Sequence, residues 1–145
     1  MNSYQSTLGT SFQQFAPVLG RILLAVLFIP AGALKITGFA ATAAMMKGKG
    51  LPMAELLLVF TIIIEFGGGL MLLLGWHARS AATVMFLFLI PVTLVFHSFW
   101  GIEDPQQAHM QQIMFIKNVA IMGGLAIVAG FGSGAFSLSK RDWLS

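Results

Sequence analysis

Four long apolar runs constrain this chain more than any other feature. They lie at about residues 17–39, 52–76, 78–100 and 111–131. A transmembrane helix needs about 20 consecutive apolar residues, and none of the runs alternates apolar with polar residues as the strand of a membrane barrel would. The sequence therefore predicts an all-α fold. We expect one domain, a polytopic membrane protein in which four transmembrane helices form an antiparallel bundle.

The composition excludes an ordinary soluble domain. Of the 145 residues, 57% are hydrophobic and 9% are charged, whereas about 25% are charged in an average soluble domain. The formal net charge of +3 is scattered along apolar segments, which favours the lipid bilayer over nucleic acid as a partner. The absence of cysteine excludes disulfides, thiol relays and c-type haem. No pair of histidines has the spacing of a metal or haem site, so no metal is expected.

The segments between the runs predict topology and location. Residues 1–16 are polar and contain no Lys or Arg, which does not suit a signal peptide. Pro17 and Pro52 are expected in first helical turns, and Pro91 should kink the third helix. Loops are expected at 40–51, 75–80 and 101–110, followed by a basic tail at 132–145. The distribution of Lys and Arg favours two cytoplasmic termini.

Glu65 is the most informative residue, because it lies near the middle of the second run. A carboxylate there costs several kcal/mol unless it has a partner or a cavity, and its side chain is too short to reach water. Gly68 and Gly69 share its helix face, where they allow another helix to approach closely. Two interpretations stay open: a buried carboxyl that locks helices together, or an acid that handles protons or binds a ligand. Whether the chain is an enzyme stays open too.

Several other polar groups belong to the same half of the bilayer as Glu65. Lys35 and His97 lie where the first and third runs end, and Lys117 lies where the fourth begins. Snorkelling of the lysines and an interfacial place for His97 are the alternatives to a functional role. A pocket built from these groups would carry excess positive charge, which suits an anion, a carboxylate or the carbonyl oxygens of a quinone. The candidate ligand-binding residues are Lys35, Glu65, His97, Lys117 and Asn118.

A second set of residues is expected to be structural. Arg21 belongs to the opposite half of the bilayer, and the glycines provide sites of close helix approach. The set comprises Arg21, Gly32, Gly68, Gly69, Pro91, Gly123 and Gly124.

The chain resembles the DoxX family of small four-helix bacterial membrane proteins from about Leu19 to Leu138. The resemblance rests on the segments GRILLAVLFIPAGALKITGF, EFGGGLMLLLGW, FHSFW and FIKNVAIMGGLAIVAGFGSGAFSL. The motif residues are Arg21, Gly32, Lys35, Phe39, Glu65, Gly68, Gly75, His97, Lys117, Asn118, Gly123 and Gly124. The family's best-known members are membrane subunits of thiosulfate:quinone oxidoreductase, which implies association with redox enzymes. The resemblance also implies a location in the cytoplasmic (inner) membrane of a bacterium.

The lack of cysteine sets a limit on what the resemblance implies, because no thiol can hold a sulfur-transfer intermediate. We therefore expect a quinone- or anion-binding subunit that associates with a membrane redox system. A quinone is one candidate ligand beside an anion, and no cofactor is expected to be covalently attached. Two alternatives remain: a small-solute transporter that works as a homo-oligomer, and a non-catalytic membrane scaffold.

Overall fold

A computed structural model describes the backbone of residues 3–138 and the side chains of residues 12–138. Helices, and no strands, occur over these residues. They are α1 (Ser3–Thr37), α2 (Phe39–Gly48), α3 (Ala54–Ile62), the π-helical turn η1 (Ile63–Gly67), α4 (Gly68–Leu74), α5 (Ala78–Phe96) and α6 (Pro105–Phe131). The segments long and apolar enough to cross a membrane are Phe12–Thr37, Ala54–Leu74, Ala78–Phe96 and Pro105–Phe131. The predicted all-α fold with four membrane-spanning helices is confirmed.

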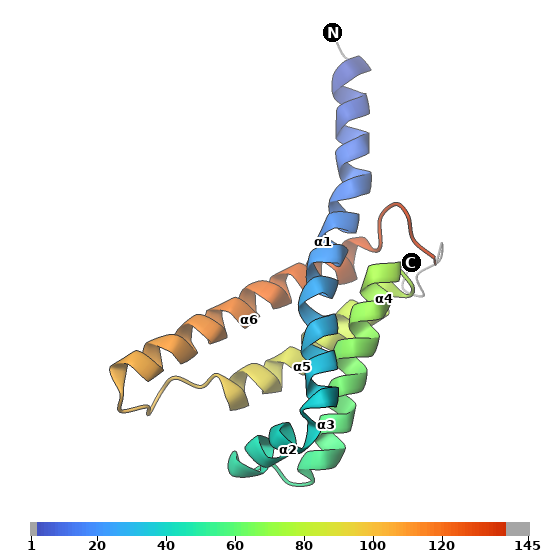
Figure 1. Ribbon diagram of the computed structural model, residues 1–145. Coiled ribbons are helices and arrows are strands. Elements are labelled where there is room, and N and C mark those ends of the chain that lie inside the picture. The colour runs from blue at the N-terminus through green and yellow to red at the C-terminus, as the bar shows by residue number, and fades with distance from the viewer. Residues whose placement is uncertain (1–2, 139–145) are drawn as a thin grey trace.

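The helices are arranged as two arms (Figure 1). The first arm consists of α1 packed against the continuous helix α3–η1–α4, and the second arm consists of α5 packed against α6. The arms meet near the C-terminal end of α4 and diverge towards α2 and the α5–α6 connection. The bundle therefore has a joined end and an open end.

Small residues hold the joined part of the bundle together. A Cβ on Gly69 would lie 2.9 Å from Ile29 Cγ1, and one on Gly68 would lie 2.6 Å from Met85 Sδ. A Cβ on Gly32 would lie 2.8 Å from the backbone nitrogen of Phe66. Helices in lipid associate through such close van der Waals packing, since burial of apolar side chains gains little there. The main buried cluster lies in the same part of the bundle: Ala25, Phe28, Leu72, Ala78, Ala81, Ala82, Met85, Leu89, Leu125 and Val128.

Two predicted irregular segments are helical instead. The prediction of a loop at 40–51 is wrong, since α2 spans Phe39–Gly48. Its alanines and methionines have high helix propensity, and Ala43 and Met46 bury themselves in a cluster with Ala54 and Leu58. The loop predicted at 101–110 is also shorter than expected. Asp104 caps α6 by accepting from the backbone N–H of Gln106 at 3.1 Å, and Pro105 begins the helix.

The first helix also begins earlier than predicted. Because α1 starts at Ser3, Pro17 lies inside the helix and not in its first turn. A proline removes one helical hydrogen-bond donor. The segment that follows α6 contacts the part of α1 that precedes Pro17. The carbonyl of Gln14 accepts from Ala135 N at 3.1 Å, and the rings of Phe15 and Phe136 lie 5.7 Å apart.

Arg21 fastens the joined end of the bundle. Its side chain is buried, with 1% of the residue exposed, so it does not snorkel to water. It donates to Leu72 O at 3.3 Å and to Phe136 O at 3.2 Å, and Ala135 O lies 3.4 Å from Nη2. Gly75 ends α4 with a φ of +66°, and a Cβ there would lie 1.9 Å from Arg21 Nη1. The segment that follows α6 is thereby tied across the end of α4.

Candidate functional site

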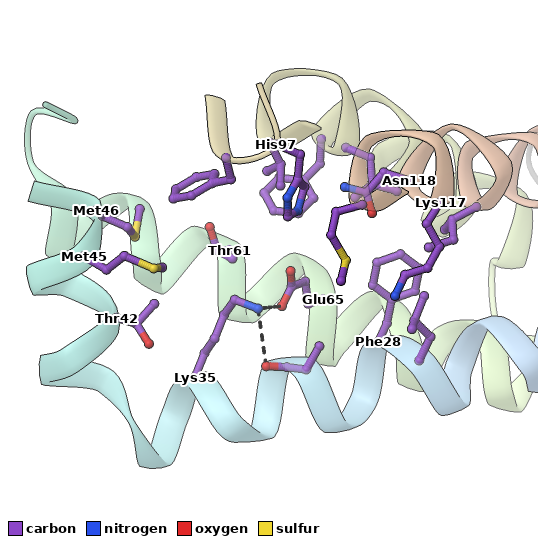
Figure 2. A pocket seen from close by; sticks show the side chains of 18 of the residues that line it. Phe28, Lys35, Thr42, Met45, Met46, Thr61, Glu65, His97, Lys117 and Asn118 are labelled. Atoms are coloured by element: carbon purple, nitrogen blue, oxygen red, sulfur yellow. Dashed lines mark hydrogen bonds and ion pairs between the residues drawn. The ribbon is translucent and has the colours of Figure 1, made fainter. Parts of the chain in front are cut away.

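A cavity of about 510 Å³ lies between the two arms towards the open end of the bundle (Figure 2). Its walls come from α1, α2, α3, η1, α5 and α6. All five candidate ligand-binding residues line it: Lys35, Glu65, His97, Lys117 and Asn118. The structure thus brings together residues from four membrane-spanning segments that the sequence placed in one half of the bilayer.

The first arm contributes a buried ion pair. Lys35 Nζ donates to Glu65 Oε2 at 2.7 Å, with 28% of the Lys35 side chain and 9% of the Glu65 side chain exposed. Nζ also lies 3.5 Å from the carbonyl of Ala31, one turn earlier in α1. Lys35 therefore turns into the bundle and does not snorkel along α1. The Glu65 carboxylate is matched by a cation at its own site.

Glu65 occupies the π-helical turn η1, a feature that the sequence analysis missed. In a π-helix the hydrogen bonds join residues five apart, and single π turns within α-helices are frequent at functional sites. The turn adds a residue to the helix between α3 and α4, which alters the directions in which the side chains on either side of it point. The apolar pattern of residues 52–76 is continuous through this turn, so the sequence contains no signal that locates the π-helical turn.

The second arm contributes a network of hydrogen-bonded polar groups. His97 follows α5, and its Nδ1 lies 3.0 Å from Gln111 Oε1, within hydrogen-bond distance. Asn118 Nδ2 donates to Thr93 Oγ1 at 3.1 Å, and Thr93 Oγ1 donates to Leu89 O at 2.6 Å within α5. Gln111 was missed by the sequence analysis, although a polar side chain at the start of an apolar run is a usable signal. Pro91 lies within the same part of α5.

Lys117 and Lys49 line the cavity without an acidic partner among residues 12–138, Lys117 from α6 and Lys49 from the residue that follows α2. The charged residues of the lining are Lys35, Lys49, Lys117 and Glu65, and Glu65 is paired with Lys35. Within residues 12–138, Lys117 has no ion pair and no side-chain hydrogen bond. Figure 2 shows its side chain extending from α6 towards Phe28 of α1. The ammonium group thus lies in the cavity, where it is available to a ligand.

The remaining candidates lie away from these groups. Arg21 is at the joined end of the bundle, where it binds Leu72 O. A Cβ on Gly124 would touch Leu24 Cδ2 at 3.6 Å, whereas one on Gly123 would meet no described atom within 4 Å. Glu55 pairs with Lys47 on the exposed side of α2 and α3. The charges at the open end are thus mixed, with the unpaired positive charge inside the cavity.

These features define a class: a small α-helical membrane protein with four spanning helices and a cavity within the bundle whose apolar walls carry a few polar groups. Residues 16–98 match the family model of DoxX. The inner membrane protein YqjF of Escherichia coli strain K12 is 38% identical over 123 residues, which cover 85% of this chain and 88% of YqjF. The inner membrane protein YphA of the same organism is 28% identical over 124 residues, 86% of this chain and 88% of YphA. No solved structure matches the chain.

The chain belongs to the DoxX family, and it has four helices long and apolar enough to cross a membrane among the described residues. The range matched by the family model includes Lys35, Glu65 and His97, and it ends before α6 with Lys117. The match therefore extends across the first arm and α5.

Proposed function

We propose that this protein binds, in the cavity between its arms, a small ligand with acceptor oxygens on an apolar body. A quinone head group and an organic anion both meet this description. The observation that carries the proposal is the placement of Lys117, an ammonium group in the cavity lining with no acidic partner among residues 12–138. An ammonium group has three donors and no acceptor, so it favours a ligand with oxygen lone pairs or negative charge.

The shape and lining of the cavity support this proposal. Small-molecule sites typically measure about 300–1,000 Å³ and combine apolar walls with a few polar groups that orient the ligand. This cavity, at about 510 Å³, lies in that range. Phe28, Phe88 and Phe96 supply aromatic surface for a flat ring or an alkyl chain. A ligand that partitions into lipid can reach such a site without leaving the membrane.

The redox role is carried over from the best-known members of the DoxX family. On this proposal, the protein is the ligand-binding subunit of a membrane redox system whose electron-transfer centres lie on partner proteins. Glu65, held by Lys35, is the candidate for an acid that accepts or releases a proton as the ligand changes its charge. We extend the proposal to two cytoplasmic termini, on the distribution of Lys and Arg, and to a homo-oligomer in the membrane.

The proposal is tested by equilibrium binding to the full chain in lipid nanodiscs. A decyl-benzoquinone and laurate are titrated, with empty nanodiscs as the control for partitioning, and tryptophan fluorescence is recorded. Hydrogen bonds to charged groups contribute about 1.5–3 kcal/mol, so Lys117→Met should weaken binding of both probes by about 10- to 100-fold. Lys47→Met removes the same group from outside the lining and should leave both affinities unchanged. Unsaturable binding, or equal affinities for wild type and Lys117→Met, would overturn the proposal.

A further inference from the structure

The second arm presents hydrogen-bond acceptors to the cavity as well as the Lys117 donor. From this we infer that the ligand carries a hydroxyl donor beside its acceptor, as a phenol or hydroquinone does, and that His97 accepts from that hydroxyl while Gln111 positions the His97 ring. The inference rests on the proposed function, because it specifies the class of ligand for the same cavity.

The hydrogen bond of His97 determines which ring nitrogen is free. An amide oxygen cannot donate, so the contact between Nδ1 and Gln111 Oε1 requires the proton to be on Nδ1. In neutral imidazole, the other nitrogen then carries the lone pair. The His97 ring lines the cavity, and no residue between 12 and 138 contacts Nε2 through a hydrogen bond. His97 therefore offers an acceptor to whatever occupies the cavity.

Asn118 supplies a second acceptor on the same wall. One of its amide hydrogens is used by Thr93 Oγ1, and the Thr93 hydroxyl is itself used by the carbonyl of Leu89. The amide oxygen of Asn118 has no partner in the part of the chain that the structure describes, and Asn118 lines the cavity. The second arm thus combines two acceptors with the ammonium group of Lys117.

This combination of two acceptors and one donor distinguishes ligands that carry only acceptors from ligands that also carry a hydroxyl donor, a distinction that the proposed function does not make. A carboxylate anion or an oxidised quinone carries acceptors only, so it can bind Lys117 but leaves Nε2 of His97 without a partner once it displaces water. A buried acceptor without a partner is unfavourable. A phenolic hydroxyl can donate to Nε2, and its ring can pack against Phe28 and Phe96 of the lining. Aromatic rings favour such offset or edge-to-face contacts.

Gln111 acts through His97 and is a positioning residue. The cap of α6 at Asp104 and its start at Pro105 place Gln111 in the second turn of α6, beside the residue that follows α5. The backbone N–H of His97 donates to Thr93 O at 3.1 Å, which holds the base of the side chain. With the backbone held there and the ring held by Gln111, Nε2 points in one direction.

The test compares two probes that are inert to redox chemistry. The probes are 4-decylphenol, which can donate and accept, and 4-decylanisole, which can only accept. In nanodiscs, the full chain should bind the phenol about five- to tenfold more tightly than the anisole, as expected from one additional hydrogen bond. His97→Phe should remove this preference, and His97→Gln, whose amide oxygen can reach the position of Nε2, should restore part of it. Lys117→Met should weaken the binding of both probes.

The role of Gln111 has its own readout. Nitrogen-15 NMR of labelled histidine should show the Nδ1–H tautomer of His97 in the wild type and a shift towards the Nε2–H tautomer in Gln111→Leu. The same variant should bind the phenol and the anisole with similar affinities. Equal binding of the two probes with intact dependence on Lys117, or an unchanged tautomer in Gln111→Leu, would overturn this inference alone. Absence of saturable binding of either probe and of the quinone would overturn the proposed function with it.

Discussion

The ion pair between Lys35 and Glu65 makes the sharpest energetic prediction. Two unit charges 2.7 Å apart attract by about 6 kcal/mol at an effective dielectric constant of about 20. Desolvation offsets part of this attraction, and removal of one partner from a buried pair typically costs about 3–5 kcal/mol because the other charge is left uncompensated. Since the Lys35 side chain retains 28% of its exposure, we expect the lower end of that range, about 3 kcal/mol, for Glu65→Gln and for Lys35→Met.

A double-mutant cycle separates the pair from its surroundings. The double substitution Lys35→Met/Glu65→Gln should lower the free energy of unfolding by less than the sum of the two single substitutions. The difference is the coupling free energy, which we expect to be about 2–3 kcal/mol, within the range for residues in contact. Unfolding by SDS in mixed micelles, followed by circular dichroism, gives the free energies. The exposed pair of Lys47 with Glu55 is the matched control, and its coupling should be close to zero. Additive losses at Lys35 and Glu65 would refute the reasoning.

Further predictions concern packing, the joined end and the charge of the cavity. Gly32→Ala should destabilise the protein by about 1–3 kcal/mol, because the added methyl group overpacks on Phe66. Gly123→Ala, whose methyl group would meet open space, should be neutral or stabilise the protein by up to about 1 kcal/mol. The same SDS titration measures both effects. Arg21→Met should cost about 2–4 kcal/mol, because buried carbonyls lose their donor, and laurate affinity should not change. Glu65→Gln frees the Lys35 ammonium and should tighten laurate binding several-fold in nanodisc titrations; weaker laurate binding by a folded Glu65→Gln protein would contradict the pairing of Glu65 with Lys35.

Much of the fold could be predicted, because lipid imposes a strict rule on the sequence. Every backbone polar group in the hydrocarbon must be satisfied within its own segment, so long apolar runs become helices. The rule is weaker at the membrane surface, and there the predictions were wrong. The segment of α2 contains Lys47 and is too short to span a membrane, so the sequence predicts a loop there. It forms a helix because Ala43 and Met46 pack against Ala54 and Leu58 in a buried cluster.

The depth of the polar residues could also be predicted, whereas their partners could not. Position along a span fixes depth to within a turn, and this was enough to place Lys35, Glu65 and Lys117 in the same half of the bilayer. Which lysine meets Glu65 depends on how each helix is rotated about its axis. That rotation is set by contacts such as Gly69 on Ile29 and by the π-helical turn at Ile63–Gly67. No periodicity in the sequence predicts the glycine contact or the π-helical turn.

Photo-crosslinking tests the central claim, a ligand site between the two arms, most directly. An azido-benzoquinone with a decyl chain is irradiated with the full chain in nanodiscs, and the adducts are mapped by mass spectrometry of peptide fragments. Adducts should fall on cavity-lining residues in two stretches, residues 27–35 of α1 and 111–121 of α6. They should decrease with excess unlabelled quinone and in Lys117→Met. Adducts confined to exposed apolar residues such as Ile127 and Phe131, unaffected by competitor, would contradict the account.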